Sequence, residues 1–367
     1  MRILIIDHYY PAYLDYLYKK NSDFFYLNYN EQKNAIFNNC FGVANFYSKN
    51  LKKLGHVAQE IIYNNEVLQK QWAKEKKLKY SKSYFKNIPK LRTWLKSNWE
   101  EKILKAQIEE FSPDIIYCQN LSYPNQNFLQ ELKKRVKLII GQVACPIDFD
   151  KQKLKAFDII LTSFPHYVDR FKKIGINSEY FKIGFEDSII KKLKKSEKQN
   201  EAVFVGGFSK RHSEAINIFE YLAKNTNLNF WGYGANELSA NSIIKQNHRG
   251  ESWGINMYNI LYNSRISINR HIDAAENYAN NMRLYESTGV GTMLITDNKN
   301  NINELFKVGK EIETYKSKEE LLEKINYYLS HEEERDKIAK AGQARTLKDH
   351  TYKTRMKELV QILNKYL

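Results

Sequence analysis

Short apolar runs alternate with longer segments of helical periodicity along this 367-residue chain, a pattern typical of a parallel α/β sheet. The runs are nearly all apolar, as expected of strands buried on both faces. In the first half they predict strands at 2–6, 57–62, 114–118, 137–141 and 157–161. In the second half they predict strands at 202–205, 228–231, 265–268, 292–296 and, more weakly, 311–314. The halves therefore predict two α/β units of similar architecture, although no internal sequence repeat relates them.

Glycine and polar positions indicate where these units begin and end. Residues 42–55 (GVANFYSKNLKKLG) carry apolar side chains at helical spacing and predict a helix that ends at Gly55. Residues 191–200 (KKLKKSEKQN) are almost all polar or charged, which is a linker composition. We therefore expect a first domain over 1–190 and a second over 191–351.

The C-terminal tail has a purely helical pattern. From Lys318 onward it predicts two or three helices, with a break at Gly342. The last of these helices is expected at about 352–367.

Composition narrows the function classes. Apolar residues make up 43% of the chain, which excludes a disordered protein, and no stretch approaches the ~18 apolar residues of a membrane span. The opening MRILIID is too short for the apolar region of a signal peptide. Cys40, Cys118 and Cys145 are odd in number, widely spaced and without a CxxC pair. This pattern argues against a disulfide framework or a zinc site and favours a reducing cytosol.

The net charge of the chain indicates an anionic partner. The chain has 58 Lys and Arg against 42 Asp and Glu, a net charge of +16. Ten of these bases and only one acid, Glu75, lie between residues 70 and 96, interleaved with Trp, Tyr and Phe. Such a segment suits an anionic lipid surface or a single-stranded nucleic acid, so peripheral association with the inner face of a membrane stays open. A solvated, lysine-rich helical face explains the segment more simply than nucleic-acid binding does.

The most informative segment is NNMRLYESTGVGTMLIT, which predicts a helix followed by a strand. Asn280 or Asn281 can cap the helix, Arg283 and Glu286 share one face, and Gly289 is expected to end it. A helix N-terminus in an α/β domain attracts anions, so Arg283 there can clamp a diphosphate. Glu286 can accept both hydroxyls of a ribose, as acidic residues do in dinucleotide folds. The alternative is an ordinary surface Arg–Glu pair.

Two glycine-containing turns follow predicted strands of the second half. In VFVGGFSKRH, Gly206 and Gly207 let the backbone approach a phosphate or sugar, and Lys210 and Arg211 supply charge. Gly232 in WGYG repeats the theme after the next strand. Ligands of open α/β sheets bind at this carboxyl edge. Neither turn is a P-loop or GxGxxG, so an ordinary strand-to-helix turn is the alternative.

Candidate chemistry in the first half is sparser. His8 leaves the first strand in DHYYP and is a candidate general base, although a lone histidine is more often structural. Gly42 and Asn45 open the following helix, and Asp148 and His166 follow later strands. There is no Ser/His/Asp constellation, no HExxH and no EF-hand loop, so the sequence predicts no metal site.

Five motifs follow one another in the second half: VGGFSKR (205–211), the strand ending at Asn269, NMRLYESTGVGTMLITD (281–297), EIETYKSKEELLEKINYYL (311–329) and IAKAGQARTLKDHTYKTRM (338–356). In this order they resemble bacterial glycosyltransferases of the GT-B fold, in particular the group similar to the spore-maturation protein CgeB. The first half matches more loosely, through ILIID and GVANFYSKNLKKLGH.

The resemblance implies two facing Rossmann-like domains, with a C-terminal helix that crosses back to the first. It implies a UDP-, GDP- or dTDP-sugar donor on the second domain, no metal, and a glycan, glycolipid or protein acceptor on the first. By motif, Arg283 meets the diphosphate and Glu286 the ribose. The remaining donor-side candidates are Gly206, Gly207, Lys210, Arg211, Gly232, Asn269 and Asn281; those on the acceptor side are His8, Gly42, Asn45, Lys76 and Lys77.

One departure from the family leaves the stereochemistry open. Many related retaining enzymes carry two glutamates eight positions apart, but Tyr278 stands eight before Glu286. An inverting route needs a base near the acceptor hydroxyl, for which His8 and Asp148 are the candidates. Two alternatives to a transferase are an epimerase or phosphorylase on the same fold, and a basic nucleic-acid or membrane-surface binding protein.

Overall fold

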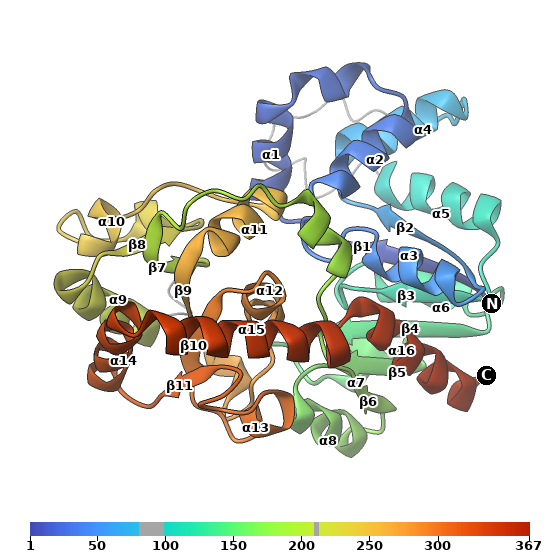
Figure 1. The fold of residues 1–367 in the computed structure, drawn as a ribbon. Helices are drawn as coiled ribbons and strands as arrows, with labels where there is room; N and C mark the ends of the chain where they lie inside the picture. The colour runs from blue at the N-terminus through green and yellow to red at the C-terminus, as the bar shows by residue number, and fades with distance from the viewer. Residues whose placement is uncertain (81–98, 209–212) are drawn as a thin grey trace.

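Two parallel sheets form the framework of the protein in a computed structural model that describes residues 1–80, 99–208 and 213–367 (Figure 1). The first sheet has the order β2-β1-β3-β4-β5-β6 and the second β11-β10-β9-β7-β8. The strands are β1 (Arg2–Asp7), β2 (Val57–Ile62), β3 (Ile115–Cys118), β4 (Leu138–Val143), β5 (Ile159–Thr162), β6 (Ser178–Tyr180), β7 (Asn200–Val205), β8 (Leu228–Trp231), β9 (Ser264–Asn269), β10 (Met293–Asp297) and β11 (Glu313–Tyr315).

The strand predictions are confirmed, with ends that move by at most two residues. Strands such as β1 and β3 are buried on both faces between helical layers, and this is why an apolar run was a sufficient signal for them. The short strand β6 was missed because its sequence, Ser-Glu-Tyr, has no apolar run. It pairs with β5 at the edge of the first sheet.

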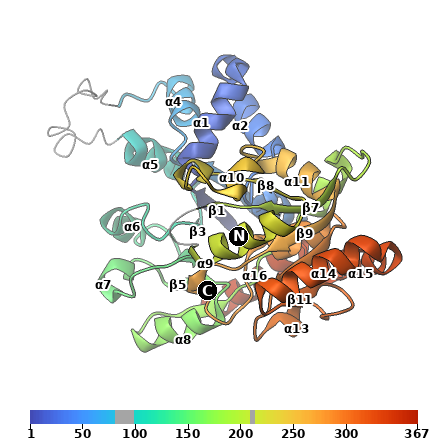
Figure 2. The ribbon, with the colours of Figure 1, turned by 90° about the vertical axis from the view of Figure 1, so that its left-hand side faces the viewer.

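Helices cover both faces of each sheet, as the two views in Figures 1 and 2 show. The first unit contains α1 (Pro11–Lys20), η1 (Ser22–Tyr26), α2 (Tyr29–Asn38), α3 (Phe46–Lys53), α4 (Glu66–Glu75), α5 (Trp99–Phe111), α6 (Gln126–Leu132), α7 (Lys151–Leu154), α8 (Pro165–Lys173) and η2 (Asp187–Lys192). The second contains α9 (Ser213–Asn225), η4 (Ala235–Glu237), α10 (Ile243–Gln246), α11 (Gly254–Tyr262), η5 (Asp273–Ala275), α12 (Met282–Gly289), α13 (Ile302–Leu305), α14 (Lys318–Ser330) and α15 (Glu332–Asp349), followed by α16 (Tyr352–Tyr366).

The strand order is the same in the two sheets. In each, the second strand along the chain lies on one side of the first strand, and the third lies on the other side. The direction of winding therefore reverses between β1 and β3, and again between β7 and β9. All pairings within both sheets are parallel, so the carboxyl ends of neighbouring strands lie at a common edge.

The chain passes from the first sheet to the second through η2 and residues 193–199. This stretch has the polar composition expected of a linker, but α11 holds it in place. The side-chain oxygens of Asn259 and Asn263 accept hydrogen bonds from the backbone N–H groups of Lys194 (2.8 Å) and Ser196 (3.0 Å).

The tail forms three helices, and α15 runs unbroken through Gly342. The predicted break there is wrong. A side chain at Gly342 would meet the backbone oxygen of Glu311 at 2.3 Å, so glycine allows the helix to pack closely rather than ending it.

The last helix, α16, crosses back onto the first unit, and both chain termini lie there (Figure 1). It packs on α3, where the ring of Tyr352 lies 5.4 Å from that of Phe46 and 5.5 Å from that of Tyr47. The expected architecture of two Rossmann-like units joined by a returning helix is therefore confirmed.

A buried polar junction fixes the start of α16. Arg355 is buried and donates to the backbone oxygens of Ile183 (3.1 Å) and Asp349 (2.8 Å), and its Nη2 lies 3.1 Å from Nδ1 of His350. The other ring nitrogen of His350 lies 2.9 Å from the oxygen of Leu305. Neutral His350 satisfies both contacts by accepting at Nδ1 and donating from Nε2, and burial lowers its pKa from 6.5 to about 4.

We predict that this histidine makes the protein less stable in mild acid. Because its pKa is lower in the folded state, its contribution is complete above pH 6.5 and is lost as the pH falls toward 4. In His350→Gln the free energy of unfolding should fall less steeply over this window than in the parent chain. Urea titrations at several pH values measure the slope, with His331→Gln as the exposed-histidine control. Equal slopes in parent and His350→Gln would contradict the junction's role.

Candidate functional site

The carboxyl edge of the second sheet gathers most of the predicted donor-side residues. Ligands of doubly wound sheets bind outside this edge, where the winding reverses. Here the reversal lies between β7, which ends at Val205, and β9, which ends at Asn269. Arg283, at the start of α12, donates to the backbone oxygen of Val205 at 2.9 Å. The Arg283 helix therefore begins at the point where a ligand is expected.

Arg283 and Glu286 form a buried ion pair rather than the surface pair considered as the alternative. The distance from Arg283 Nη1 to Glu286 Oε2 is 2.8 Å, and the side chains are 14% and 8% exposed. Glu286 Oε1 also accepts the hydroxyl of Tyr258 at 3.2 Å. The Nε atom of Arg283 is buried without a hydrogen-bond partner among the described residues. A buried donor left unpaired is costly, so this atom is suited to a further acceptor.

The start of α12 is organised by side-chain amides. Asn281 occupies the predicted N-cap position, but it forms no capping hydrogen bond. Its amide instead donates to Asn269 Oδ1 at 2.7 Å, and Asn269 donates to Asn281 Oδ1 at 3.2 Å and to Thr296 Oγ1 at 2.9 Å. This leaves the first N–H groups of α12 without a side-chain cap, and they carry the positive end of the helix dipole.

The helix α12 ends at Gly289, as predicted. Gly289 is its last helical residue, but the left-handed turn that follows lies at Gly291, with φ +84°. A side chain at Gly289 would overlap the ring of Phe185 at 2.5 Å. Gly289 is therefore required for packing against the first unit, and Gly291 for the turn.

The two glycine turns pack against one another. Gly232 has φ +137°, and a side chain there would meet the backbone oxygen of Gly206 at 1.8 Å. A side chain at Gly207 would meet the ring of Tyr233 at 2.5 Å. These glycines bring the turns after β7 and β8 into contact, which is a packing requirement independent of any ligand. The remaining predicted donor-side residues, Lys210 and Arg211, lie outside the described residues.

A buried histidine–aspartate pair lies beside this edge and was missed in the sequence. His271 Nδ1 is 2.7 Å from Asp297 Oδ1, and Lys299 Nζ is 3.2 Å from Asp297 Oδ2. These charges and hydrogen bonds hold the pKa of Asp297 well below its usual range despite burial. His271 Nε2 is buried and has no partner among the described residues. The sequence offered one signal for this pair. His271 follows the end of β9 by two residues, and Asp297, 26 positions later, ends β10.

At the carboxyl edge of the first sheet, His8 lies where the winding reverses between β1 and β3. Its Nδ1 is 2.7 Å from the hydroxyl of Tyr63, and the ring of Tyr63 stacks on that of Tyr123 at 3.7 Å. Partial burial lowers the pKa of His8 below 6.5. The imidazole is therefore neutral at neutral pH and able to accept a proton.

The turn that contains Gly42 contacts the second unit. Gly42 has φ +57°, and Cys40 and Ala44 also adopt positive φ angles, which non-glycine residues rarely do. Asn45 follows at the N-cap of α3 and forms no side-chain capping bond. The backbone oxygen of Asn39 accepts a hydrogen bond of 2.6 Å from Ile255 in α11.

The other residues predicted in the first unit make contacts that do not involve His8. Asp148 is exposed and pairs with Lys153 at 2.7 Å. Lys76 pairs with Glu110 at 2.8 Å, and Lys77 is exposed.

Direct contacts hold the two carboxyl edges face to face. Tyr10 of the first unit lies 6.2 Å from Tyr233 of the second, ring to ring. Asn280 donates to Ser163 Oγ at 2.8 Å. Tyr278 is stacked on His166 with a ring distance of 5.2 Å. The position where related retaining enzymes carry a second glutamate thus makes a contact between the units.

Two further features bear on ligands. Within the described ranges, no cluster of three or more His, Cys, Asp or Glu gathers as a metal site would require, and no helix there is long and apolar enough to cross a membrane.

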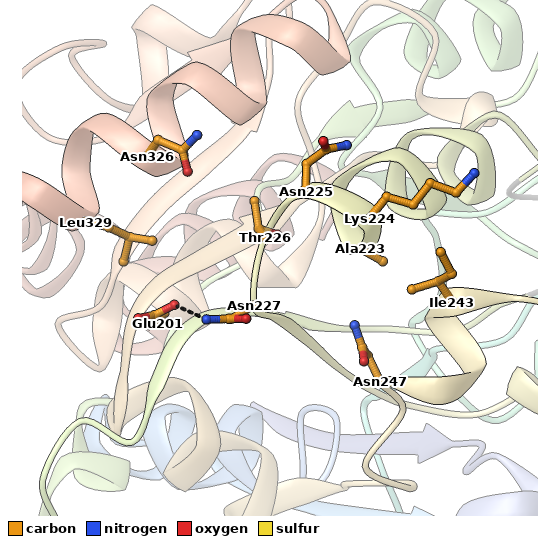
Figure 3. A pocket seen from close by; sticks show the side chains of 10 residues that line it. All are labelled: Glu201, Ala223, Lys224, Asn225, Thr226, Asn227, Ile243, Asn247, Asn326 and Leu329. Carbon is orange, nitrogen blue, oxygen red and sulfur yellow. Dashed lines mark hydrogen bonds between the residues drawn. The ribbon is translucent and has the colours of Figure 1, made fainter.

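A pocket of about 500 Å³ (Figure 3) lies at the opposite, amino ends of β7 and β8, where Glu201 and Asn227 share a hydrogen bond of 3.1 Å. It is remote from the carboxyl edge.

Comparisons with known proteins agree with this arrangement. Residues 211–361 match the model of a family described as glycosyl transferase-like. No curated protein matches the chain. Among solved structures, it is similar to Anabaena Alr3699/HepE in complex with UDP and glucose (TM-score 0.63, 11% identity, all of both chains covered). It is also similar to a Rickettsia africae glycosyltransferase (0.60, 15%, all of this chain and 98% of that one) and to the lipopolysaccharide outer core galactosyltransferase WaaB (0.54, 16%, all of both).

The fold is therefore that of the GT-B glycosyltransferases, as the resemblance implied. The matched family segment contains α12 and the histidine–aspartate pair. The narrower likeness to the CgeB group remains a prediction.

We predict that the contact between the glycine turns contributes strongly to stability. Gly232→Ala should lose at least about 3 kcal/mol, because the new side chain would overlap a backbone oxygen as well as strain the backbone. Gly250→Ala is the matched control, since Gly250 also has positive φ (+100°) but faces open space. It should lose only about 1–2 kcal/mol. If both variants lost the same free energy of unfolding in urea titrations, the close contact between the two turns would not contribute to stability.

Proposed function

We propose that the protein is a glycosyltransferase that moves a sugar from a nucleotide-sugar donor to a glycan, glycolipid or protein acceptor. The observation that carries this proposal is the buried Arg283–Glu286 pair at the winding reversal of the second sheet. The family match over the same segment supports it.

The donor is proposed to lie against the start of α12. Glu286 has lone pairs beyond those used by Arg283 and Tyr258, so its carboxylate can accept the ribose hydroxyls. The diphosphate would lie at the uncapped N-terminus of α12, near the unpaired Nε of Arg283. HepE structures contain UDP or UDP-glucose, which favours UDP among the three nucleotides considered.

Charge development explains why these groups suit sugar transfer. Breaking the bond between the anomeric carbon and the diphosphate leaves negative charge on the departing oxygen. Arg283 and the α12 dipole would stabilise that charge in a preorganised way, a contribution often worth a few kcal/mol. We propose that these protein groups, together with Arg211 of the VGGFSKR motif, do this without a metal ion.

On the acceptor side, His8 fits a general base better than Asp148 does. His8 lies at the winding reversal of the first sheet, is neutral, and is oriented through Nδ1 by Tyr63, which leaves Nε2 for the acceptor hydroxyl. Asp148 is instead exposed and neutralised by Lys153. Base catalysis by His8 corresponds to an inverting reaction, which agrees with Tyr278 in place of a second glutamate.

The cysteines support a cytoplasmic location. Cys40 and Cys118 are buried thiols that form no disulfide, as in a protein of a reducing compartment.

Glu286→Gln tests the donor site. It keeps the size of the side chain but removes the charge that pairs with Arg283 and accepts the ribose, so nucleotide affinity should fall about 10- to 100-fold. Calorimetry with UDP measures the affinity, and assays with a donor panel measure turnover. Glu332→Gln is the matched control, since Glu332 also pairs with an arginine three positions away, Arg335, on α15. Equal UDP affinity in both variants would remove Glu286 from the donor site.

His8→Asn tests the acceptor base. It should abolish sugar transfer while leaving UDP affinity unchanged, and Asp148→Asn should retain transfer. In the parent chain, turnover should fall as the pH drops through the lowered pKa of His8, because the protonated ring cannot accept a proton. Full transfer by His8→Asn would contradict the assignment. Product analysis without acceptor also separates a transferase from an epimerase, which converts the donor sugar without releasing free nucleotide.

A further inference from the structure

The most exposed aromatic side chains among the described residues lie at the tip between α1 and α2. Phe25 is 54% and Tyr26 is 91% exposed. The tip belongs to a projection formed by α1, η1, α2 and α4, at the top of Figures 1 and 2. The ring of Phe25 lies 5.3 Å from that of Tyr18 and is half exposed, whereas the ring of Tyr26 is almost fully exposed, so both present apolar surface to a partner.

A groove of about 580 Å³ runs from Phe25 to one face of α4. Val67, Lys70 and Lys74 recur at helical spacing along that face, and Leu78 continues it beyond the helix end. The groove is thus lined by apolar side chains and by the stems of lysines. The full lining is Phe25, Val67, Lys70, Gln71, Lys74, Leu78, Lys79 and Tyr80.

Several lysines lie close to this apolar surface. Lys19 and Lys20 are exposed in the last turn of α1, beside the tip. Lys70 pairs with Glu66, but Lys74 and Lys79 are exposed and form no ion pair with any acid in the described ranges. The surface therefore combines apolar side chains with several exposed lysines.

The projection is also firmly built. The hydroxyl of Tyr18 in α1 lies 2.9 Å from Oδ1 of Asn65 at the start of α4 and 3.1 Å from Oε1 of Gln32 in α2, and these two oxygens share its single proton. Asn65 also caps α4. Because these hydrogen bonds tie α1, α2 and α4 together, the tip and the groove keep their relative position.

We propose that this aromatic–lysine surface, made of Phe25, Tyr26 and the groove residues, docks on an anionic phospholipid bilayer. The exposed rings of Phe25 and Tyr26 can enter the acyl boundary, while each lysine near the surface gains about 1 kcal/mol from anionic headgroups. A single-stranded nucleic acid needs stacking faces and cations, and aliphatic groups in the groove add nothing to that interaction. The docking goes beyond the proposed sugar transfer and does not depend on it. If both proposals hold, the docked enzyme reaches a lipid-linked acceptor at the membrane.

Vesicle flotation tests the proposal with the full chain. The protein should float with phosphatidylcholine vesicles that contain phosphatidylglycerol, and not with phosphatidylcholine alone. Phe25→Ser/Tyr26→Ser and Lys74→Glu/Lys79→Glu should each weaken binding about tenfold or more. Lys337→Glu/Lys340→Glu, on exposed positions of α15, makes the same charge change elsewhere and should bind like the parent. Unchanged thermal midpoints and circular dichroism spectra would confirm that the variants are folded.

Three results would overturn the proposal. Binding to neutral vesicles that equals binding to anionic ones would exclude charge recognition. If the α15 control weakened vesicle binding equally, the binding would depend on the net charge of the protein and not on this surface. Absence of flotation together with RNA binding at physiological salt, or with dimers lost in Phe25→Ser/Tyr26→Ser, would reassign the surface to nucleic acid or to a second copy of the chain.

Discussion

Parallel pairing is the constraint on which the rest of this structure depends. In a parallel sheet every strand ends at the same edge, and a reversal of winding leaves that edge uncovered at one point. The protein uses this geometry twice, between β1 and β3 and between β7 and β9. His8 lies at the first reversal and Arg283 at the second, although 275 positions separate them in sequence. The proposed acceptor and donor residues can act together only because the carboxyl edges of the two sheets face each other.

The interface between the two carboxyl edges is held by contacts that are not part of either sheet. The buried junction of Arg355 and His350 returns α16 to the first unit, and Tyr10, Tyr278 and Asn280 connect the carboxyl edges. These contacts fix the relative orientation of the proposed donor and acceptor sides. Transfer between two substrates needs such an orientation, because misplacing the reacting groups by even about 1 Å costs rate steeply.

The sequence predicted the sheets well because buried parallel strands need apolar residues at every position. It failed where a residue's environment decides its role. Gly342 interrupts nothing, because a close backbone contact requires glycine inside a helix. Asn281 occupies the N-cap position without capping, since its side-chain oxygen accepts a hydrogen bond from Asn269 instead. The spacing of Arg283 and Glu286 indicated a pair, but its burial could not be predicted without Tyr258 from a distant helix, and His271 had no local pattern that linked it to Asp297.

The most direct test of the account is a crystal structure of the protein with bound UDP. The account predicts that the ribose hydroxyls lie within hydrogen-bond distance of the Glu286 carboxylate, with the diphosphate at the start of α12 and close to Arg283. A nucleotide bound elsewhere would contradict it, for example in the polar pocket at the amino ends of β7 and β8.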